Sequence, residues 1–324
     1  MKLVYRMHTK DDEAALIRLW SEHGGWDQVD AETWAHRLLR PPLGEAAIAL
    51  AVDADSDEIL AQFAFIPSLI SVNGREVSAL RPFAPVFATA ARRRSLVTSV
   101  HPVLKLYWHA VGALRARGDG LIYMVPDPRW VRFLRLLPYM QCGSFPLWSL
   151  PVPLVAPLSL GSGYAVASLP TWDERVDRLW DSASRLHQCL VVRDARTLPW
   201  KLSHGDYTVT AIERGGELVG LVASCQKGDR QWLVCDLLAA DDGDSLRATL
   251  TAAVNIGHAE AVAAEPERPI RKVAILATPV LEPVLRDLGF TRDAYDFPLM
   301  IHILNPALPK QDVAPERWYL SAND

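Results

Sequence analysis

Hydrophobic residues in the first half of the chain follow two periodicities in turn, one of two residues and one of three to four. Period-two alternation at 3–7 predicts a strand, and helical spacing at 11–24 and 31–39 predicts two helices. The first helix has acidic residues at its start and glycine at its end, and the second is stopped by Pro41 and Pro42. The chain is therefore expected to open with a strand and two helices.

An antiparallel meander is predicted next. Three strand-like segments follow one another at 46–54, 58–72 and 75–89. The turns between them have hairpin chemistry, most clearly the Asn73-Gly74 pair.

A long helix and three shorter elements complete this half. Apolar side chains share one face of a helix that starts at Pro102 and ends at Gly118. A strand at 120–127, a helix at 128–137 with proline at its first position, and a closing strand at 140–152 follow. The predicted order is β-α-α-β-β-β-α-β-α-β.

The second half of the chain repeats this order. Residues 153–163 are rich in proline and glycine and indicate a linker. Beyond it, short strings recur in the same sequence: Arg-Leu-Trp at 18–20 and 178–180, and Phe-Pro-Leu at 145–147 and 297–299. Their collinearity predicts an internal duplication, with domains at 1–152 and 164–305 and a tail at 306–324.

Composition excludes several kinds of protein. The chain has 324 residues, of which 50% are hydrophobic and 22% charged, so it is long enough for two cores and too apolar to be disordered. A formal net charge of −4 gives no general attraction to nucleic acid or to anionic membranes. No apolar run reaches the roughly 20 residues of a membrane span, and the four cysteines form no C-x-x-C pair. We therefore expect a cytoplasmic globular protein without a membrane span and without nucleic acid among its partners.

The doubled element order resembles the GNAT (N-acetyltransferase) superfamily, in particular tandem-GNAT proteins with two fused domains. The resemblance is carried by DDEAALIRLW (11–20), VNG (72–74), DLLAADD (236–242), LRDLGF (285–290) and the tail RWYLSAND (317–324). It implies an α/β fold of two tandem GNAT-like domains, each a mixed, mainly antiparallel sheet flanked by helices. It also implies a cleft between splayed central strands that takes acetyl-CoA or another acyl-CoA, with the amine of a small molecule or peptide as acceptor.

The resemblance places the cofactor phosphates at the turn before the long helix of the first half. In the family this turn is glycine-rich, and backbone amides and the helix dipole bind the pyrophosphate. The side chains offered to phosphate are Arg92, Arg93, Arg94, Ser95, Thr98 and Ser99. Because no glycine lies between Gly74 and Gly112, an arginine clamp would replace the backbone amides. The alternative is a solvated basic loop in which Ser99 or His101 caps the helix.

The corresponding turn of the second half is acidic. It carries Asp241, Asp242 and Asp244, which would repel a phosphate and which suit the start of a helix. Asp244 or Ser245 is therefore expected to be a helix cap, and the second domain a degenerate copy that shapes the pocket.

Two residues are candidates for the chemistry of acyl transfer, which needs a deprotonated amine, a stabilised oxyanion and often an acid for the leaving thiolate. The resemblance implies Tyr139 as that acid, with a packing role as the alternative. Asp127 lies at the carboxyl end of the strand at 120–127, where it would serve as a base or amine anchor, or else as a turn residue before Pro128. Glu76 is a weaker candidate base.

Aromatic and histidine residues complete the set of candidates. Five tryptophans lie in segments that border the cleft in this family: Trp20, Trp26, Trp34, Trp130 and Trp148. One or two of them are expected to line an apolar pocket and the rest to belong to the core. The nine histidines lack metal-ligand spacing, so we expect no metal site. Walker, G-x-S-x-G and G-x-G-x-x-G motifs are absent from the sequence.

The sequence supports two hypotheses. The first is an acyl-CoA-dependent N-acyltransferase, most simply an acetyltransferase, whose first domain holds the cofactor. The second is a catalytically inactive GNAT-like binding or scaffolding protein whose phosphate turn no longer works. The sequence does not indicate an oligomeric state.

Overall fold

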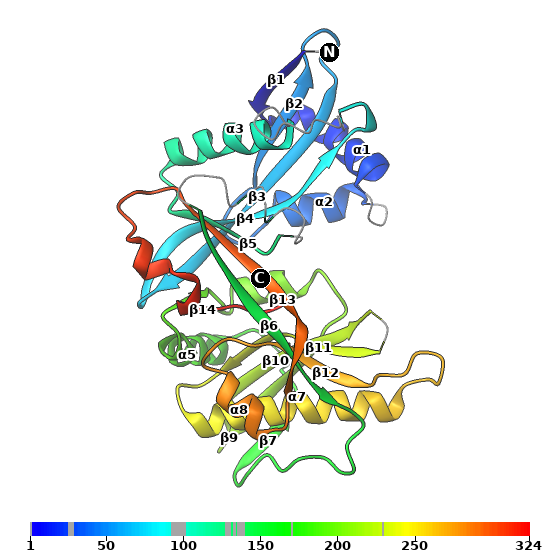
Figure 1. The fold of residues 1–324 in the computed structure, drawn as a ribbon, viewed down its shortest axis with the longest axis vertical. Helices are drawn as coiled ribbons and strands as arrows, with labels where there is room; N and C mark the ends of the chain where they lie inside the picture. Colours follow the sequence, from blue (N-terminus) through cyan, green and yellow to red (C-terminus); the bar gives the residue numbers. More distant parts are fainter. Residues whose placement is uncertain are drawn as a thin grey trace.

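The computed structural model describes residues 2–24, 29–91, 102–126, 131, 134, 140–169, 171–228 and 230–324. Within these, helices and strands form two consecutive runs with the same order (Figure 1). The strands of the first run are β1 (Leu3–Met7), β2 (Ala47–Asp53), β3 (Ile59–Val72), β4 (Arg75–Phe87), β5 (Leu121–Met124) and β6 (Met140–Pro151). Its helices are α1 (Glu13–His23), α2 (Ala31–Leu38) and α3 (Pro102–Arg117), with 3-10 turns at Lys10–Asp12 and Thr89–Ala91.

Among the described residues, the second run matches the first and adds two short strands and helix α8. Its strands are β7 (Tyr164–Ala167), β9 (Thr208–Arg214), β10 (Glu217–Lys227), β11 (Gln231–Ala239), β12 (Lys272–Leu276) and β13 (Thr291–Ile303). Its helices are α5 (Glu174–Ala183), α6 (Thr197–Leu202), α7 (Gly243–Ala263) and α8 (Glu282–Asp287). The additional strands are β8 (Cys189–Val191) and β14 (Trp318–Tyr319), and 3-10 turns lie at Ser184–Leu186, Lys310–Val313 and Pro315–Arg317.

Local sequence signals set most of these boundaries. Asn73 and Gly74 both have positive φ, 50° and 76°, as the two central residues of a tight hairpin turn require. Helix α3 begins at Pro102 and is followed by Gly118 at φ 88°. The predicted cap of α7 is wrong by a few residues, because the Asp242 carboxylate accepts the hydrogen bond from the backbone N–H of Ser245.

The paired strands form one sheet, and the order of its strands is symmetric about the centre of the sheet. That order is β1-β2-β3-β4-β5-β13-β6-β12-β11-β10-β9-β7, so each strand of the first run mirrors its counterpart in the second. At the centre, β6 and β13 run antiparallel with Phe145 opposite Phe297. Both residues belong to the repeated Phe-Pro-Leu string, so the two copies of this string meet at the point where the two runs mirror each other.

The last strand of each half is exchanged with the other half. Strand β13 pairs with β5, and β6 pairs with β12, whereas the sequence predicts that 140–152 closes the first half. Strands pair through their backbones, and the two final strands share the Phe-Pro-Leu pattern, so side chains alone do not reveal the exchange. The domain boundaries at 152 and 164 stay a prediction.

Helices cover both faces of the first half of the sheet. The Phe65 ring on β3 lies 6.0 Å from that of Tyr107 on α3, whereas Phe83 on β4, paired with Ala64, stacks 5.2 Å from Trp20 on α1. Because successive side chains of a strand point to opposite faces, α3 and α1 lie on opposite sides of the sheet. The buried apolar residues form one large cluster in each half and a smaller one around the exchanged strands.

Candidate functional site

The predicted cofactor-binding residues and the two main catalytic candidates all lie outside the part of the chain that the structure describes. They are Arg92, Arg93, Arg94, Ser95, Thr98, Ser99, Asp127 and Tyr139. Their roles stay predictions. The described elements next to these segments in the chain include β4, β5 and helix α3, and β3 lies beside β4 in the sheet.

Strands β4 and β5 separate after a short contact. They pair in parallel at only two positions, Ala79 with Leu121 and Leu80 with Ile122. Beyond Leu80, β4 continues along β3, and a β-bulge there places residues 84–85 opposite Phe63. Among the described residues, the outer edge of this part of β4 has no strand partner, so its backbone groups face the gap between the two strands.

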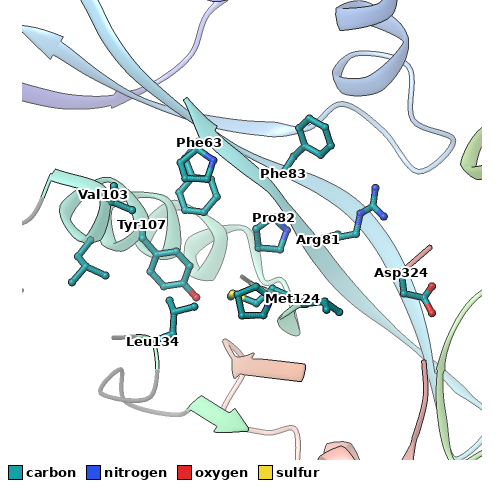
Figure 2. Close-up of a pocket in the computed structure, with 13 residues that line it drawn as sticks. Phe63, Arg81, Pro82, Phe83, Val103, Tyr107, Met124, Leu134 and Asp324 are labelled. Atoms are coloured by element: carbon teal, nitrogen blue, oxygen red, sulfur yellow. The ribbon is translucent and has the colours of Figure 1, made fainter. Parts of the chain in front are cut away.

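A cavity of about 390 Å³ lies at this gap (Figure 2). Its described lining residues are Phe63, Arg81, Pro82, Phe83, Pro85, Val103, Leu104, Tyr107, Met124, Val125, Pro126, Leu134 and Asp324. The volume is that of a small-molecule site, and the lining is apolar apart from Arg81, Asp324 and the Tyr107 hydroxyl. Figure 2 shows Val103, Tyr107 and Leu134 at one end of the group and Arg81 and Asp324 at the other.

The cavity reaches both faces of the sheet. Val103, Leu104 and Tyr107 line it from α3, which covers one face. Phe83 lines it from the opposite face, where Trp20 stacks on its ring and the Arg37 guanidinium of α2 lies 5.9 Å from the ring centroid. Two molecules that approach from opposite faces of the sheet would therefore meet in the gap between β4 and β5.

A buried polar pair forms part of the wall on the α3 side. The Tyr107 hydroxyl lies 2.7 Å from Nδ1 of His302, and Nη2 of Arg115 lies 3.4 Å from Nε2 of the same ring. Arginine only donates, so Nε2 accepts, and a neutral His302 donates its Nδ1–H to the Tyr107 oxygen. Burial, helped by Arg115, lowers the pKa of His302 to about 4, which keeps the ring neutral. The Tyr107 proton therefore stays available to a ligand, and burial raises the pKa of that hydroxyl.

The segment 318–324 closes the polar end of the cavity. Strand β14 pairs in parallel with β8 and leads the chain back to Asp324 at the cavity. The Arg81 side chain on β4 donates a hydrogen bond to the carbonyl oxygen of Asn323 at 3.0 Å, and the Asn323 N–H donates to the carbonyl oxygen of Cys235 at 3.0 Å. This segment therefore connects the first half of the sheet to β11 of the second half.

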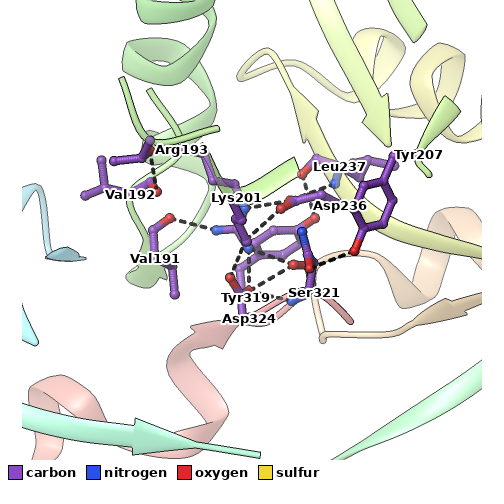
Figure 3. Close-up of polar contacts among 12 residues, drawn as sticks. Val191, Val192, Arg193, Lys201, Tyr207, Asp236, Leu237, Tyr319, Ser321 and Asp324 are labelled. Atoms are coloured by element: carbon purple, nitrogen blue, oxygen red, sulfur yellow. Dashed lines mark hydrogen bonds and ion pairs between the residues drawn. The ribbon is translucent and has the colours of Figure 1, made fainter. Parts of the chain in front are cut away.

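Four buried charges hold this segment in place (Figure 3). Asp236 accepts from Arg193 and from Lys201, each at 2.7 Å, and Asp324 accepts from the same two side chains. The two cations and two anions cancel, as burial requires. Burial raises the pKa of Asp324, but Arg193 and Lys201 outweigh it, so that pKa lies below its usual value. The Asp324 side chain is therefore a structural anion and a poor base.

The matching gap in the second half is filled by the chain itself. Strands β11 and β12 pair from Gln231 to Val234, after which β11 continues to Ala239. Residues 319–321 lie there, the Tyr319 hydroxyl donates to the Leu237 carbonyl oxygen at 2.6 Å, and the remaining space is about 0 Å³. This role of the tail was not predicted from the sequence, in which its one signal is the pair of aromatic residues in RWYLSAND.

The tryptophan candidates and Glu76 lie away from the cavity lining. Trp34 and Trp148 are buried in the cores of the first and second half, at 1% and 5% exposure, and Trp20 stacks on the cavity-lining Phe83. Trp26 and Trp130 lie outside the described residues. Glu76 is exposed beside the β3–β4 turn, at the far end of β4 from the cavity. Sequence segments alone thus did not identify which aromatic residues line the pocket.

In the described part of the chain, no group of His, Cys, Asp and Glu side chains is arranged to hold a metal ion. No helix within the described ranges is both long enough and apolar enough to cross a membrane.

The fold is similar to that of solved acetyltransferases. A GCN5-related N-acetyltransferase from Anabaena variabilis matches 94% of this chain and 73% of its own at a TM-score of 0.69 and 14% identity. A second, from Kribbella flavida, matches 94% of this chain and 72% of its own, with a TM-score of 0.62 and 18% identity. A probable N-acyltransferase from Enterococcus faecalis matches 94% of this chain and 73% of its own, with a TM-score of 0.68 and 10% identity. No protein-family model matches the sequence, and no curated protein matches it significantly.

These similarities confirm the predicted fold. The chain has the fold of the GCN5-related N-acetyltransferases, built as a mixed, mainly antiparallel sheet flanked by helices. At identities of 10 to 18%, the similarity extends to the fold alone.

Proposed function

We propose that the chain is an acyl-CoA-dependent N-acyltransferase, which moves an acyl group, most simply acetyl, to the amine of a small molecule or peptide. One observation carries the proposal: the cavity between β4 and β5 reaches both faces of the sheet. A thioester from the α3 side and an amine from the Phe83 side would meet there. The similar solved structures, two N-acetyltransferases and a probable N-acyltransferase, support the same chemistry.

The outer edge of β4 suits the arm of acyl-CoA. An unpaired strand edge binds extended chains with amide groups, because it offers backbone donors and acceptors at regular spacing. Pro82 and Pro85 have no N–H, so the remaining backbone groups of this edge would serve. The apolar lining suits an acyl chain and a thioester. The turn that joins β4 to α3 would hold the phosphates, with Arg92, Arg93 and Arg94 as the proposed clamp.

The reaction would proceed by direct transfer. The amine nitrogen attacks the thioester carbonyl carbon, the new C–N bond forms, and the C–S bond breaks. The amine loses one proton and the thiolate gains one, which leaves an amide and free CoA. In this proposal the Tyr107 O–H would donate to the acyl oxygen or to the sulfur as negative charge develops there, because Tyr107 lines the cavity and its oxygen is paired with His302. Asp127 as base or amine anchor and Tyr139 as acid remain part of the proposal.

Calorimetric binding tests the cofactor site. Acetyl-CoA, CoA and a longer acyl-CoA would be titrated into the wild type and into the triple variant Arg92→Ala, Arg93→Ala, Arg94→Ala. A matched triple variant of exposed arginines, Arg178→Ala, Arg247→Ala, Arg286→Ala, is the control. Ligand at about 100 times its dissociation constant should stabilise the fold by roughly 2.7 kcal/mol in wild type and control, and not in the clamp variant.

Failure of the wild type to bind at millimolar ligand would contradict the enzyme and favour the inactive binding or scaffolding protein. Release of CoA thiol in the presence of an amine panel then tests transfer itself. A cytoplasmic location is also part of the proposal, because all four cysteines are free, as thiols are in a reducing compartment.

A further inference from the structure

Two arginines lie near Phe83 without an acidic partner in the part of the chain that the structure describes. Arg37 lies on α2 and Arg81 on β4. Within the described ranges, neither forms an ion pair with a carboxylate, whereas Arg193 and Lys201 nearby are both paired. Asp236 and Asp324 are thus already paired with Arg193 and Lys201, so these two carboxylates are not the partners of Arg37 and Arg81.

Arg81 connects two cavities. It lines the 390 Å³ cavity and also a second one of about 40 Å³, which is lined as well by Ser68, Tyr123 and Trp200. Its one hydrogen-bond acceptor among the described residues is the neutral carbonyl oxygen of Asn323. The small cavity has room for a few atoms and presents hydroxyl groups from Ser68 and Tyr123, which lie 3.2 Å apart.

Arg37 is partly buried, and one of its N–H donors has no hydrogen-bond acceptor among the described residues. Its Nε is shielded from solvent and has no hydrogen-bond partner among the described residues. Its guanidinium lies 5.9 Å from the centroid of the Phe83 ring, so Arg37 packs against a residue that lines the cavity. A shielded cationic donor without a partner is costly, and a bound anion would remove that cost.

His204 lies near both arginines and is itself partly buried. Its Nε2 is buried without a hydrogen-bond partner in the described chain, and its ring lies 5.0 Å from that of His36. Burial first, then Arg37, His36 and Arg81, lower the pKa of His204 to about 4. Burial is the main cause of this shift, and Arg37 and Arg81 act on the same ring in the same direction, so both charges lie close enough to His204 to influence it.

We infer that the acceptor is an amine that also carries a carboxylate, such as an amino acid, and that Arg37 and Arg81 bind this carboxylate while the amine faces the thioester. The inference rests on the proposed function and names its substrate class. Guanidinium groups bind carboxylates through paired hydrogen bonds, and the small volume beside Arg81 suits a carboxylate. Arg37 and Arg81 would be binding residues, without a part in bond making.

Direct binding tests the inference without any need for catalysis. A panel of L-amino acids, their methyl esters and the matching decarboxylated amines would be titrated into wild type, Arg37→Gln, Arg81→Gln and Arg40→Gln. Arg40 is the matched control, because it lies just beyond α2, is half exposed and pairs with Glu32. At least one amino acid should bind wild type and Arg40→Gln about 10- to 100-fold more tightly than it binds Arg37→Gln or Arg81→Gln. The methyl ester and the decarboxylated amine of that amino acid should bind all four proteins weakly and with equal affinity.

Two results would overturn the inference. One is that no amino acid of the panel binds the wild type at millimolar concentration, and the other is that esters and acids bind equally well. Acyl-CoA titrations on the same samples distinguish failure of the inferred amino-acid substrate from failure of the proposed acyl transfer. If acyl-CoA binds and amino acids do not, the inference fails and the proposed function stands; if amino acids bind and acyl-CoA does not, the proposed transfer fails.

Discussion

The hydroxyl oxygen of Tyr107 lies 2.7 Å from Nδ1 of His302, although Tyr107 belongs to the first half of the chain and His302 to the second. Strand β13 carries His302 into the first half, where it replaces β6 beside β5. A wall residue of the candidate site is thus positioned by a strand of the opposite half. The second half therefore shapes the cavity directly, and the two halves are expected to unfold together.

Loss of either member of this pair should destabilise the fold. Tyr107→Phe leaves the His302 donor buried without its partner, which should lower the free energy of unfolding by about 1–3 kcal/mol. Urea denaturation measures this, with Tyr295→Phe, an exposed tyrosine, as the control. In a double-mutant cycle with His302→Leu, the two losses should be less than additive, because the second change removes the orphaned group. Strictly additive losses would argue against the pairing.

Lowering the pH from 6.5 to 4 should reduce the free energy of unfolding, and His302 is one cause. An unfolded histidine has a pKa near 6.5, whereas the folded pKa of His302 is about 4. Between these values the unfolded chain binds a proton that the folded chain does not, so stability falls as the pH drops from 6.5 to 4, by up to roughly 3 kcal/mol. His187 and His204, with pKa values lowered to about 3 and 4, act in the same direction. His302→Gln should unfold with a shallower dependence on pH in this window, and an unchanged slope would contradict the assignment.

The sequence predicts the local elements well because their signals are local. The Asn73-Gly74 turn needs two residues that tolerate positive φ, and Pro102 and Gly118 mark the two ends of α3 by backbone geometry alone. The repeated Phe-Pro-Leu string also indicates the duplication, and the structure places Phe145 opposite Phe297.

The pairing of strands that lie far apart in the sequence leaves no such local signal. Strands β6 and β13 have the same pattern, so nothing in either segment specifies that β13 pairs with β5. The positions of Arg81 and Asn323 illustrate the same limit for the site. They are hydrogen-bonded, yet 242 residues separate them in the chain.

The buried charges that hold segment 318–324 should be sensitive to loss of one partner. Asp236→Asn leaves one buried positive charge uncompensated, so the free energy of unfolding should fall by about 3–5 kcal/mol. Glu282→Gln, which breaks the helical surface pair with Arg286, should cost about 0.5 kcal/mol or less. Adding Lys201→Met to Asp236→Asn restores neutrality and should recover part of the loss. Further destabilisation by the second change would show that charge balance is not the cause.

The proposed enzyme should bind one acyl-CoA per chain. The gap between β4 and β5 holds the 390 Å³ cavity, whereas the gap between β11 and β12 is filled by residues 319–321. Displacing Tyr319, which is 2% exposed, would expose a large apolar surface to water. Calorimetry should therefore give a stoichiometry of one, and a value near two would mean that the tail leaves the second gap when ligand binds.

Filling the cavity from α3 should abolish cofactor binding while the fold is kept. Val103 lines the cavity and is 9% exposed, so Val103→Trp would place an indole in the space proposed for the acyl-CoA arm. Because that space is open, the larger side chain can be accommodated, and thermal unfolding should change little compared with a substitution in a close-packed core. Affinity for acetyl-CoA should fall by about tenfold or more, the equivalent of about 1.4 kcal/mol. Val262→Trp, on the exposed side of α7 at 67% exposure, is the matched control and should bind like the wild type. Equal affinity in Val103→Trp and wild type would place the acyl-CoA elsewhere and would remove the observation on which the proposed function depends.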